Sequence, residues 1–248
     1  SWDARATLFS SSEVEWSNSF CVNCGCSCNV GDEIHRESID VGSGIIVCGY
    51  AGTGGSYSYG QDDGYLIKYD YAGNHLWTQI HGENDKYTSY ISIEKSDNNI
   101  IGVGRYIDDE AVMTEEPADI WVVKSDLDGN IIWEKNIGEA GTPEVGYDII
   151  LTDYGTYIIS GVINEYNDAS EIWLIELDSE GYLLHDTIIE TSYSHARIGH
   201  QSLLMNEDNE LFVIYRDDNN IYISKFQMYN EDLDQSCLSD TSFTDITA

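Results

Sequence analysis

The fold of this chain is decided by one stretch of sequence, Asp119-Ile120-Trp121-Val122-Val123-Lys124-Ser125-Asp126-Leu127-Asp128-Gly129-Asn130-Ile131-Ile132-Trp133. Further copies of the stretch begin at Asp63 and Glu171, and a shortened copy begins at Asn220. The aromatic residue near the start of each copy stands at position 65, 121, 173 or 222, which gives intervals of 56, 52 and 49 residues. A repeat of about 40 to 50 residues that consists of short strands is typical of propeller blades.

A second pattern recurs between the copies. Two runs rich in Ile, Val and Tyr are joined by Gly, Asn or Asp residues in the ranges 34–49, 90–104, 147–161 and 201–215. Short β-branched runs that flank such turn residues are hairpin signals. Each unit therefore contains two hairpins, or four strands, which is the content of one propeller blade.

The number of expected strands suggests how the ring closes. The segment Glu13–Phe20 resembles the outer strand Ile131–Ile137 of another repeat, whereas no good copy of that strand follows Phe226. We therefore predict an all-β fold, a four-bladed β-propeller of four-stranded antiparallel blades, closed by an N-terminal strand. Completing the last blade in this way removes an exposed strand edge. The expected domains are a tail at 1–12, the propeller at 13–228 and a second tail at 229–248.

At these residues the chain resembles the secreted β-propeller repeat proteins of bacteria and archaea. Their blades read roughly Asp-aromatic-Leu-Val-Lys-x-Asp-x-x-Gly-Asn-x-x-Trp, and the match extends from Glu13 to Gln227. The third repeat departs from the pattern with His185 in place of Trp, and the fourth lacks the Gly-Asn turn. The resemblance implies a binding, adhesive or structural module. It supplies no shared catalytic residues.

Charge narrows the classes of partner. The 248 residues include 45 acidic and 11 basic side chains, for a formal net charge of -34. Such a field repels nucleic acids and anionic membranes, and it favours cations or serves solubility alone. No apolar run approaches the roughly 18 residues of a membrane span, so we expect no membrane insertion. The polar start Ser1-Trp2-Asp3 is not a signal peptide, so a secreted protein would be represented here in its mature form.

The cysteines suggest an extracellular or cell-surface location. An even number of cysteines in a chain of secreted character predicts disulfides; the six are Cys21, Cys24, Cys26, Cys28, Cys48 and Cys237. We expect at least one bond from the 21–28 cluster to Cys48 or Cys237. A thiolate metal site and free thiols are the alternatives, although no second distant Cys-x-x-Cys pair is present to complete a zinc site.

Few residues indicate chemistry. Asp126, Asp128 and Asn130 have oxygen side chains at alternate positions, a spacing used by calcium loops, and calcium is the one cofactor that we consider. A plain turn is the alternative, because position twelve of the loop is Ile137 rather than a bidentate Glu. His35 and His200 begin first strands of blades and are expected at the mouth of the central channel. We predict no catalytic residues, since nucleophile-elbow, Walker and zinc-protease motifs are absent.

The leading functional prediction is a non-enzymatic structural or adhesive protein that assembles with itself into an extracellular filament or surface layer. Strand addition between subunits is directional and satisfies main-chain hydrogen bonds. The residues expected to mediate assembly are Trp2, Leu8, Phe9, Val14 and Trp16. One alternative is a module that binds a glycan, a protein or a cell surface, with candidate aromatics Tyr50, Tyr57, Tyr59 and Tyr106. Another is a secreted hydrolase or lyase that uses channel-mouth acids and histidines.

Overall fold

A computed structural model of the chain describes residues 4–10, 13–20, 33–52, 62–82, 86–108, 118–139, 141–164, 170–189, 196–216, 220–227, 239–240 and 244–246. Strands fill most of these ranges, and the described residues contain no helix. The strands are β1 (Ala4–Ser10), β2 (Glu13–Phe20), β3 (Glu33–Asp40), β4 (Ile45–Gly52), β5 (Asp62–Tyr69), β6 (His75–His81), β7 (Lys86–Ser96), β8 (Asn99–Asp108), β9 (Asp119–Asp126), β10 (Ile131–Ile137), β11 (Glu144–Leu151), β12 (Tyr157–Ile163), β13 (Glu171–Leu177), β14 (Leu183–Ile189), β15 (Arg197–Met205), β16 (Glu210–Arg216), β17 (Ile221–Gln227), β18 (Ser239–Asp240) and β19 (Thr244–Ile246).

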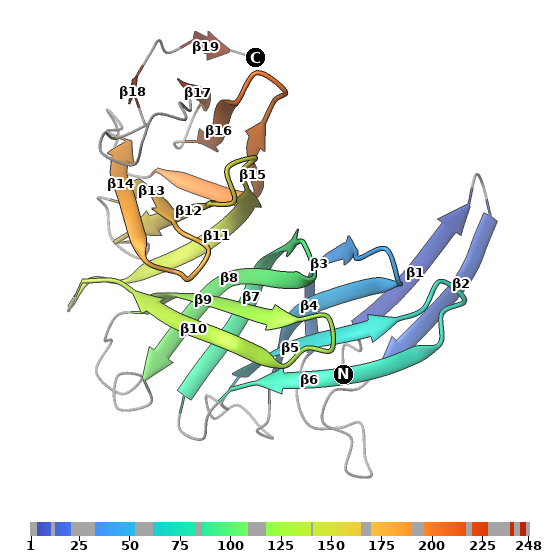
Figure 1. Cartoon of the computed structure of the whole chain (residues 1–248). Helices are drawn as coiled ribbons and strands as arrows, with labels where there is room; N and C mark the ends of the chain where they lie inside the picture. The colour runs from blue at the N-terminus through green and yellow to red at the C-terminus, as the bar shows by residue number, and fades with distance from the viewer. Residues whose placement is uncertain are drawn as a thin grey trace.

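Four antiparallel sheets follow one another along the chain and form the four-bladed β-propeller that the repeat predicts (Figure 1). Blade 1 contains β3 to β6, blade 2 contains β7 to β10, and blade 3 contains β11 to β14. Blade 4 contains β15 to β17. Within each blade the strands pair in chain order, and the first strands of successive blades contact one another, so the first strand lies nearest the axis and the last lies at the rim. The prediction of four blades is confirmed.

Apolar side chains fill the junctions between successive blades. The junction of blades 1 and 2 is centred on Trp121, whose ring lies 4.8 Å from that of Tyr90 and packs with Ile46 and Leu66 of blade 1. The junction of blades 2 and 3 joins Val103 and Val122 to blade 3 residues such as Ile159. Blades 3 and 4 share a third cluster. The repeated Trp residues of the third strands are therefore core residues, as the period-2 pattern of each strand requires.

The repeated turns are built by side-chain hydrogen bonds. The Asp126 carboxylate accepts bonds from the main-chain N–H groups of Asp128 and Asn130, each at 2.9 Å. The same arrangement recurs at Asp70, Thr152, Asp178 and Asn206. Gly129 has φ +80°, in the left-handed region, and glycine stands at this fourth turn position in three of the other turns. Asx and ST turns of this kind explain why Asp and Gly recur at fixed spacing.

A hydrogen-bonded network links the blades close to the axis. Ser92 Oγ on β7 lies 2.7 Å from Glu37 Oε2 on β3 and 3.0 Å from Asp148 Oδ1 on β11. Glu37 also accepts a bond from the Ile93 N–H, and Asp148 accepts one from the Leu203 N–H of blade 4. Burial raises the pKa of Asp148, and these donors oppose the rise. The axial acids are thus engaged in holding inner strands together.

The prediction for the closing strand is wrong within this chain. Strand β2, which carries Val14 and Trp16, pairs with β1 rather than with blade 4. The outer side of β17 is instead covered by two pieces of the C-terminal segment, β18 and β19. The first strand of blade 1, β3, begins at Glu33. A strand only a few residues away in the chain is a more accessible partner than a blade at the far end of the chain.

Candidate functional site

The rim of blade 4 is the least complete part of the propeller. Its third strand, β17, has seven residues, yet β18 contributes only two residues and β19 only three. The described pairs join Ile221 to Ile246, Tyr222 to Asp245 and Ile223 to Thr244, and two further pairs join Phe226 and Gln227 to β18. In contrast, β6, β10 and β14 are continuous seven-residue outer strands. Among the described residues, two short strands therefore cover the edge of blade 4, whereas each of the other blades has one continuous outer strand.

A two-stranded hairpin lies beside blade 1. Strands β1 and β2 pair antiparallel, with Leu8 opposite Trp16 and Phe9 opposite Val14. Figure 1 shows this hairpin projecting beyond blade 1, on the other side of the molecule from β17. Four of the five predicted assembly residues thus lie in one hairpin, whereas Trp2 lies outside the described residues. An isolated two-stranded sheet is marginally stable in water, so pairing with a third strand would stabilise a hairpin of this kind.

Sequence reasoning missed a contact at the rim of blades 1 and 2, in which a Trp and a Lys of one blade hold a turn of the next; this contact is called the Trp–Lys clamp below. In blade 1, Trp77 packs on the Gly129 turn of blade 2, since a Cβ on Gly129 would lie 3.0 Å from Trp77 Cζ3. Lys68, opposite Trp77 on the adjacent strand, donates from Nζ to the Leu127 carbonyl at 3.3 Å. In each clamp a Trp and a Lys from paired strands together hold the turn of the following blade.

The same clamp joins blade 2 to blade 3. A Cβ on Gly181 would lie 2.8 Å from Trp133 Cη2, and Lys124 Nζ donates to the Ser179 carbonyl at 2.9 Å. Blade 3 replaces the pair with His185 and Glu176, and blade 4 has no Asp-Gly turn to receive a clamp. The repeated Trp of the outer strand, paired with the repeated Lys, was the available sequence signal.

The predicted calcium residues lie in an ordinary hairpin turn. Besides the two main-chain bonds, Asp126 Oδ2 accepts a bond from the Asn130 side-chain amide at 2.9 Å. Burial opposes the shift, yet the bonds from Asn130, Asp128 and Gly129 together lower the pKa of Asp126. The structure brings Asp126 and Asn130 together as turn partners. Across the described ranges no group of three or more His, Cys, Asp or Glu side chains is placed to hold a metal ion, and calcium binding stays a prediction.

The two predicted channel histidines contact different blades. His35 lies with Nδ1 3.2 Å from the Cys48 carbonyl of its own blade, and His200 lies with Nδ1 3.1 Å from the Ile91 carbonyl of blade 2. A carbonyl only accepts, so each ring donates a proton there. The bond from His200 makes it a tie between blades 4 and 2. A hydrolytic role for these rings stays a prediction.

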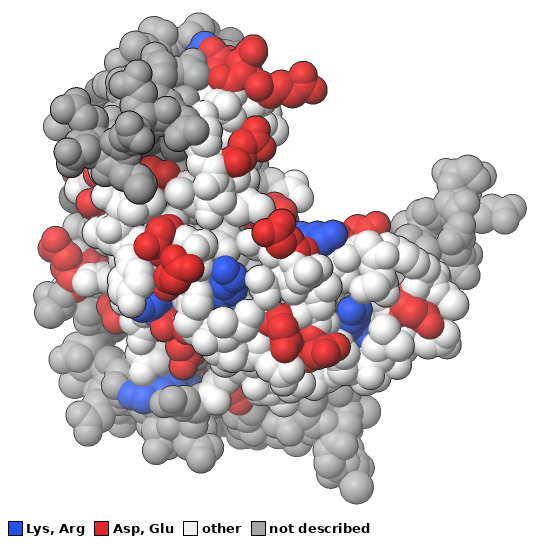
Figure 2. All heavy atoms as spheres, in the orientation of Figure 1, with Lys and Arg blue, Asp and Glu red and all other residues white. Residues whose placement is uncertain are grey.

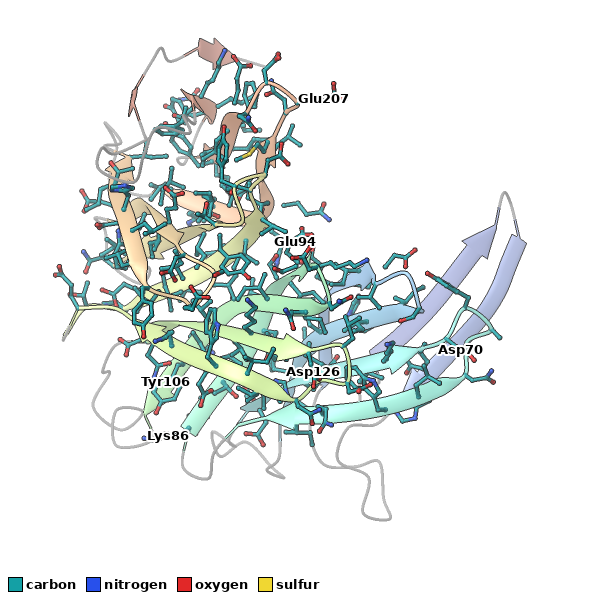
Figure 3. All side chains as sticks on the ribbon, in the orientation of Figure 1. Asp70, Lys86, Glu94, Tyr106, Asp126 and Glu207 are labelled. Atoms are coloured by element: carbon teal, nitrogen blue, oxygen red, sulfur yellow. The ribbon has the colours of Figure 1, made fainter. Side chains whose placement is uncertain are left out.

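A cleft of about 380 Å³ lies against blade 2, next to Gly82 at the end of blade 1. Its lining includes Tyr106, the edge of Trp121, Glu134 and Asn136. Trp121 Nε1 donates to Glu134 Oε2 at 3.2 Å. Figure 3 shows Tyr106 and Lys86 together at the end of blade 2, and the Lys86 ammonium lies 5.6 Å from the centre of the Tyr106 ring. Of the four aromatic residues predicted to bind a glycan, only Tyr106 lines this cleft; Tyr57 and Tyr59 fall outside the described residues.

The disulfide prediction is contradicted at Cys48. Its thiol is free and fully buried between blades 1 and 2, beside Ile46, Leu66 and Tyr90. Burial raises the pKa of this thiol, so it behaves as a small apolar core residue. Cysteine on this strand points into the junction because it alternates with Val47 and Gly49. The pairing of Cys21, Cys24, Cys26, Cys28 and Cys237 falls outside the described residues.

The surface that Figure 2 shows carries acidic groups on every blade in view, with few basic groups between them. Among the described residues there is no helix of the length and apolarity needed to cross a membrane. No protein-family model matches the chain, and no curated protein is significantly similar to it.

Proposed function

We propose that this chain is a non-enzymatic structural subunit of an extracellular filament or surface layer, in which the N-terminal hairpin of one copy adds to the rim of blade 4 of the next. The observation that carries the proposal is the mismatch between the two ends of the chain. The N-terminal end forms a two-stranded hairpin, and near the C-terminal end the described residues that pair with the outer side of β17 form two short strands, β18 and β19.

Strand addition suits both partners physically. An incoming strand that displaces β18 and β19 pairs with the main-chain N–H and C=O groups along the whole of β17 in place of five residue pairs, and it converts a two-stranded hairpin into part of a larger sheet. The two surfaces are different and lie on different parts of the molecule (Figure 1), so the contact is head-to-tail. A head-to-tail contact whose rotation does not close a ring generates a filament. The net charge of -34 opposes the approach of two copies, so salt or calcium should strengthen assembly.

The test compares the intact chain with a chain that lacks residues 1–20, by negative-stain electron microscopy and sedimentation velocity. We expect polymers of the intact chain, lengthened by sodium chloride or calcium, and monomers of the truncated chain. The melting temperature of each monomer shows whether the blades still fold. An intact chain that stays monomeric at high concentration with calcium, or a truncated chain that polymerises equally well, would contradict the proposal.

The cleft of blade 2 favours a second function, the binding of a glycan. Aromatic surface beside a carboxylate and an amide is the chemistry that holds sugar rings and their hydroxyl groups. The cleft supplies Tyr106, Glu134 and Asn136 for these roles. A glycan array probed with the intact chain and with an Asn136→Ala variant tests this function. Binding that is unaffected by the substitution, or an array without any binding, would leave the cleft without this role.

A further inference from the structure

One face of blade 4 is apolar and exposed where the same face of the other blades is buried. Ile214 pairs with Ile223 across β16 and β17, as Val103 pairs with Val122 across β8 and β9 of blade 2. Ile214 is nevertheless 40% exposed, whereas Val103 is 0% exposed. Ile221 is 56% exposed, and its counterpart Ile120 is 0% exposed. This face, formed by Phe212, Ile214, Ile221 and Ile223, is called the free face below.

Two kinds of group cover the corresponding face in blades 1 and 2. One is the next blade, and the other is the Trp of the blade's own outer strand. Trp77 packs with the core that contains Leu66, and Trp133 packs with the core that contains Val122. These cores bury the third-strand residues of both blades almost completely. Both groups are missing among the described residues of blade 4: the apolar cluster that contains its side chains includes no residue of blade 1, and β16 to β19 contain no Trp.

We propose that Trp16 of a second copy covers the free face of blade 4 when strand β2 of that copy adds to β17. This inference rests on the proposed strand addition and names the side chain that gives it affinity. Trp16 precedes Phe20 by four positions, the spacing of Trp133 and Ile137 in the outer strand of blade 2. Transferring the register of β10 on β9 places Trp16 opposite Lys225 and Phe20 opposite Ile221. The pair Trp16 and Lys225 then reproduces the Trp–Lys pairs of blades 1 and 2.

Length and charge favour this occupant. Strand β2 has eight residues and can span all seven residues of β17, whereas β18 and β19 together pair with five of them. Glu13 and Glu15 of β2 would lie near the Lys225 end of β17, which brings carboxylates to one of only 11 basic side chains in the chain. In the structure Lys225 forms an ion pair with Glu210, and the pair is partly exposed to solvent, so it costs little to rearrange. The hairpin lies beyond blade 1, on the other side of the molecule from β17 of the same copy (Figure 1), so the donor is another molecule.

The inference is tested with two pairs of matched variants of the full chain. In the donor strand, Trp16→Ala is compared with Ser17→Ala, which lies on the opposite face of β2. On the acceptor, Ile214→Asp is compared with Leu183→Asp, because both side chains are large, apolar and exposed but Leu183 lies on the outer strand of blade 3. The critical concentration for assembly is measured by sedimentation, and the protection of β16 and β17 amides is measured by hydrogen exchange.

We expect Trp16→Ala and Ile214→Asp each to raise the critical concentration at least tenfold, a loss of about 1.4 kcal/mol. The two control variants should stay within about twofold of the intact chain. If polymers form and all four variants assemble alike, the inference fails while strand addition stands. If the intact chain forms no polymer, the proposed function fails first. Assembly that leaves the amides of β17 unprotected would also overturn the inference.

Discussion

Blade 2 and blade 4 are built from the same repeat, yet only blade 2 is enclosed on both faces. Blade 2 lies between two neighbours, has a continuous outer strand and carries a Trp–Lys clamp on blade 3. Blade 4 keeps Lys225 and the apolar pattern of its strands, but among the described residues two short strands cover its rim, and it exposes Ile214 and Ile221. The comparison teaches that the repeat specifies the blade itself, whereas its neighbours decide whether the blade is complete. The incomplete blade is therefore where a partner is expected.

The largest expected loss of stability is at the junction of blades 1 and 2. Trp121 is 2% exposed and packs against Tyr90 and Gly64, so truncation to Ala leaves a large cavity. We expect Trp121→Ala to lower the free energy of unfolding by about 3–5 kcal/mol. Urea unfolding followed by circular dichroism measures this value. A loss below about 1 kcal/mol would show that the junction is not the packed core described above.

The clamp can be measured separately from the turn that it holds. Gly181 and Gly155 both have φ +80°, but a Cβ on Gly181 would meet Trp133 Cη2 at 2.8 Å and a Cβ on Gly155 would meet nothing within 4 Å. Gly155→Ala should therefore cost about 1 kcal/mol from backbone strain alone. Gly181→Ala should cost about 1–3 kcal/mol more because of the overlap with Trp133. Equal melting temperatures of the two variants would contradict the clamp.

The blades could be predicted from the sequence because their signals are local. Alternating apolar residues and Asp-Gly turns determine each hairpin, and they locate Trp121 in a core. The partner of Glu13–Phe20 could not be predicted in this way, because strand resemblance does not say which of two edges is closer. Cys48 was wrongly predicted to form a disulfide because the even number of cysteines was given more weight than the position of Cys48 in an apolar strand. The Trp–Lys clamp could be predicted only if it were known which blades are neighbours, because its Trp and Lys contact a turn of the next blade.

Buried acids should make the blades less stable as the pH rises. Gly138 lies between Asp119 and the fully buried Glu144, since a Cβ there would be 2.6 Å from Asp119 Oδ1 and 2.9 Å from Glu144 Oε2. Burial, and then the charges of Asp119 and Glu139, raise the pKa of Glu144 to about 7. The pKa of Glu144 is higher in the folded protein than in the unfolded chain. The contribution of protonated Glu144 to the free energy of unfolding is therefore fully present below about pH 4.5 and is lost as the pH rises through 7.

The variant Glu144→Gln isolates this effect, because an amide stays neutral at every pH. We expect it to match the intact chain at pH 5 and to be more stable at pH 8, by on the order of 1 kcal/mol. Thermal melts at the two pH values measure the difference. Glu180→Gln is the control, since it removes one charge from an exposed turn and should shift both melts alike. An unchanged pH dependence in Glu144→Gln would show that Glu144 is ionised in the folded protein.

The smallest expected change in stability comes from a serine substitution in blade 4, and comparing it with the equivalent substitution in blade 2 tests directly whether the two blades differ in burial. Val103→Ser introduces a hydroxyl into a fully buried junction and should cost about 2–3 kcal/mol. Ile214→Ser places the same hydroxyl at the equivalent position of blade 4, where the side chain is 40% exposed, and should change the free energy of unfolding of the monomer by less than about 0.5 kcal/mol. Both values come from urea unfolding below the concentration at which polymers form. If Ile214→Ser costs as much as Val103→Ser in the monomer, the face of blade 4 is covered within a single chain and is not available to a second copy. If the cost of Ile214→Ser appears only when polymers form, the two blades differ in what covers them and not in how they fold.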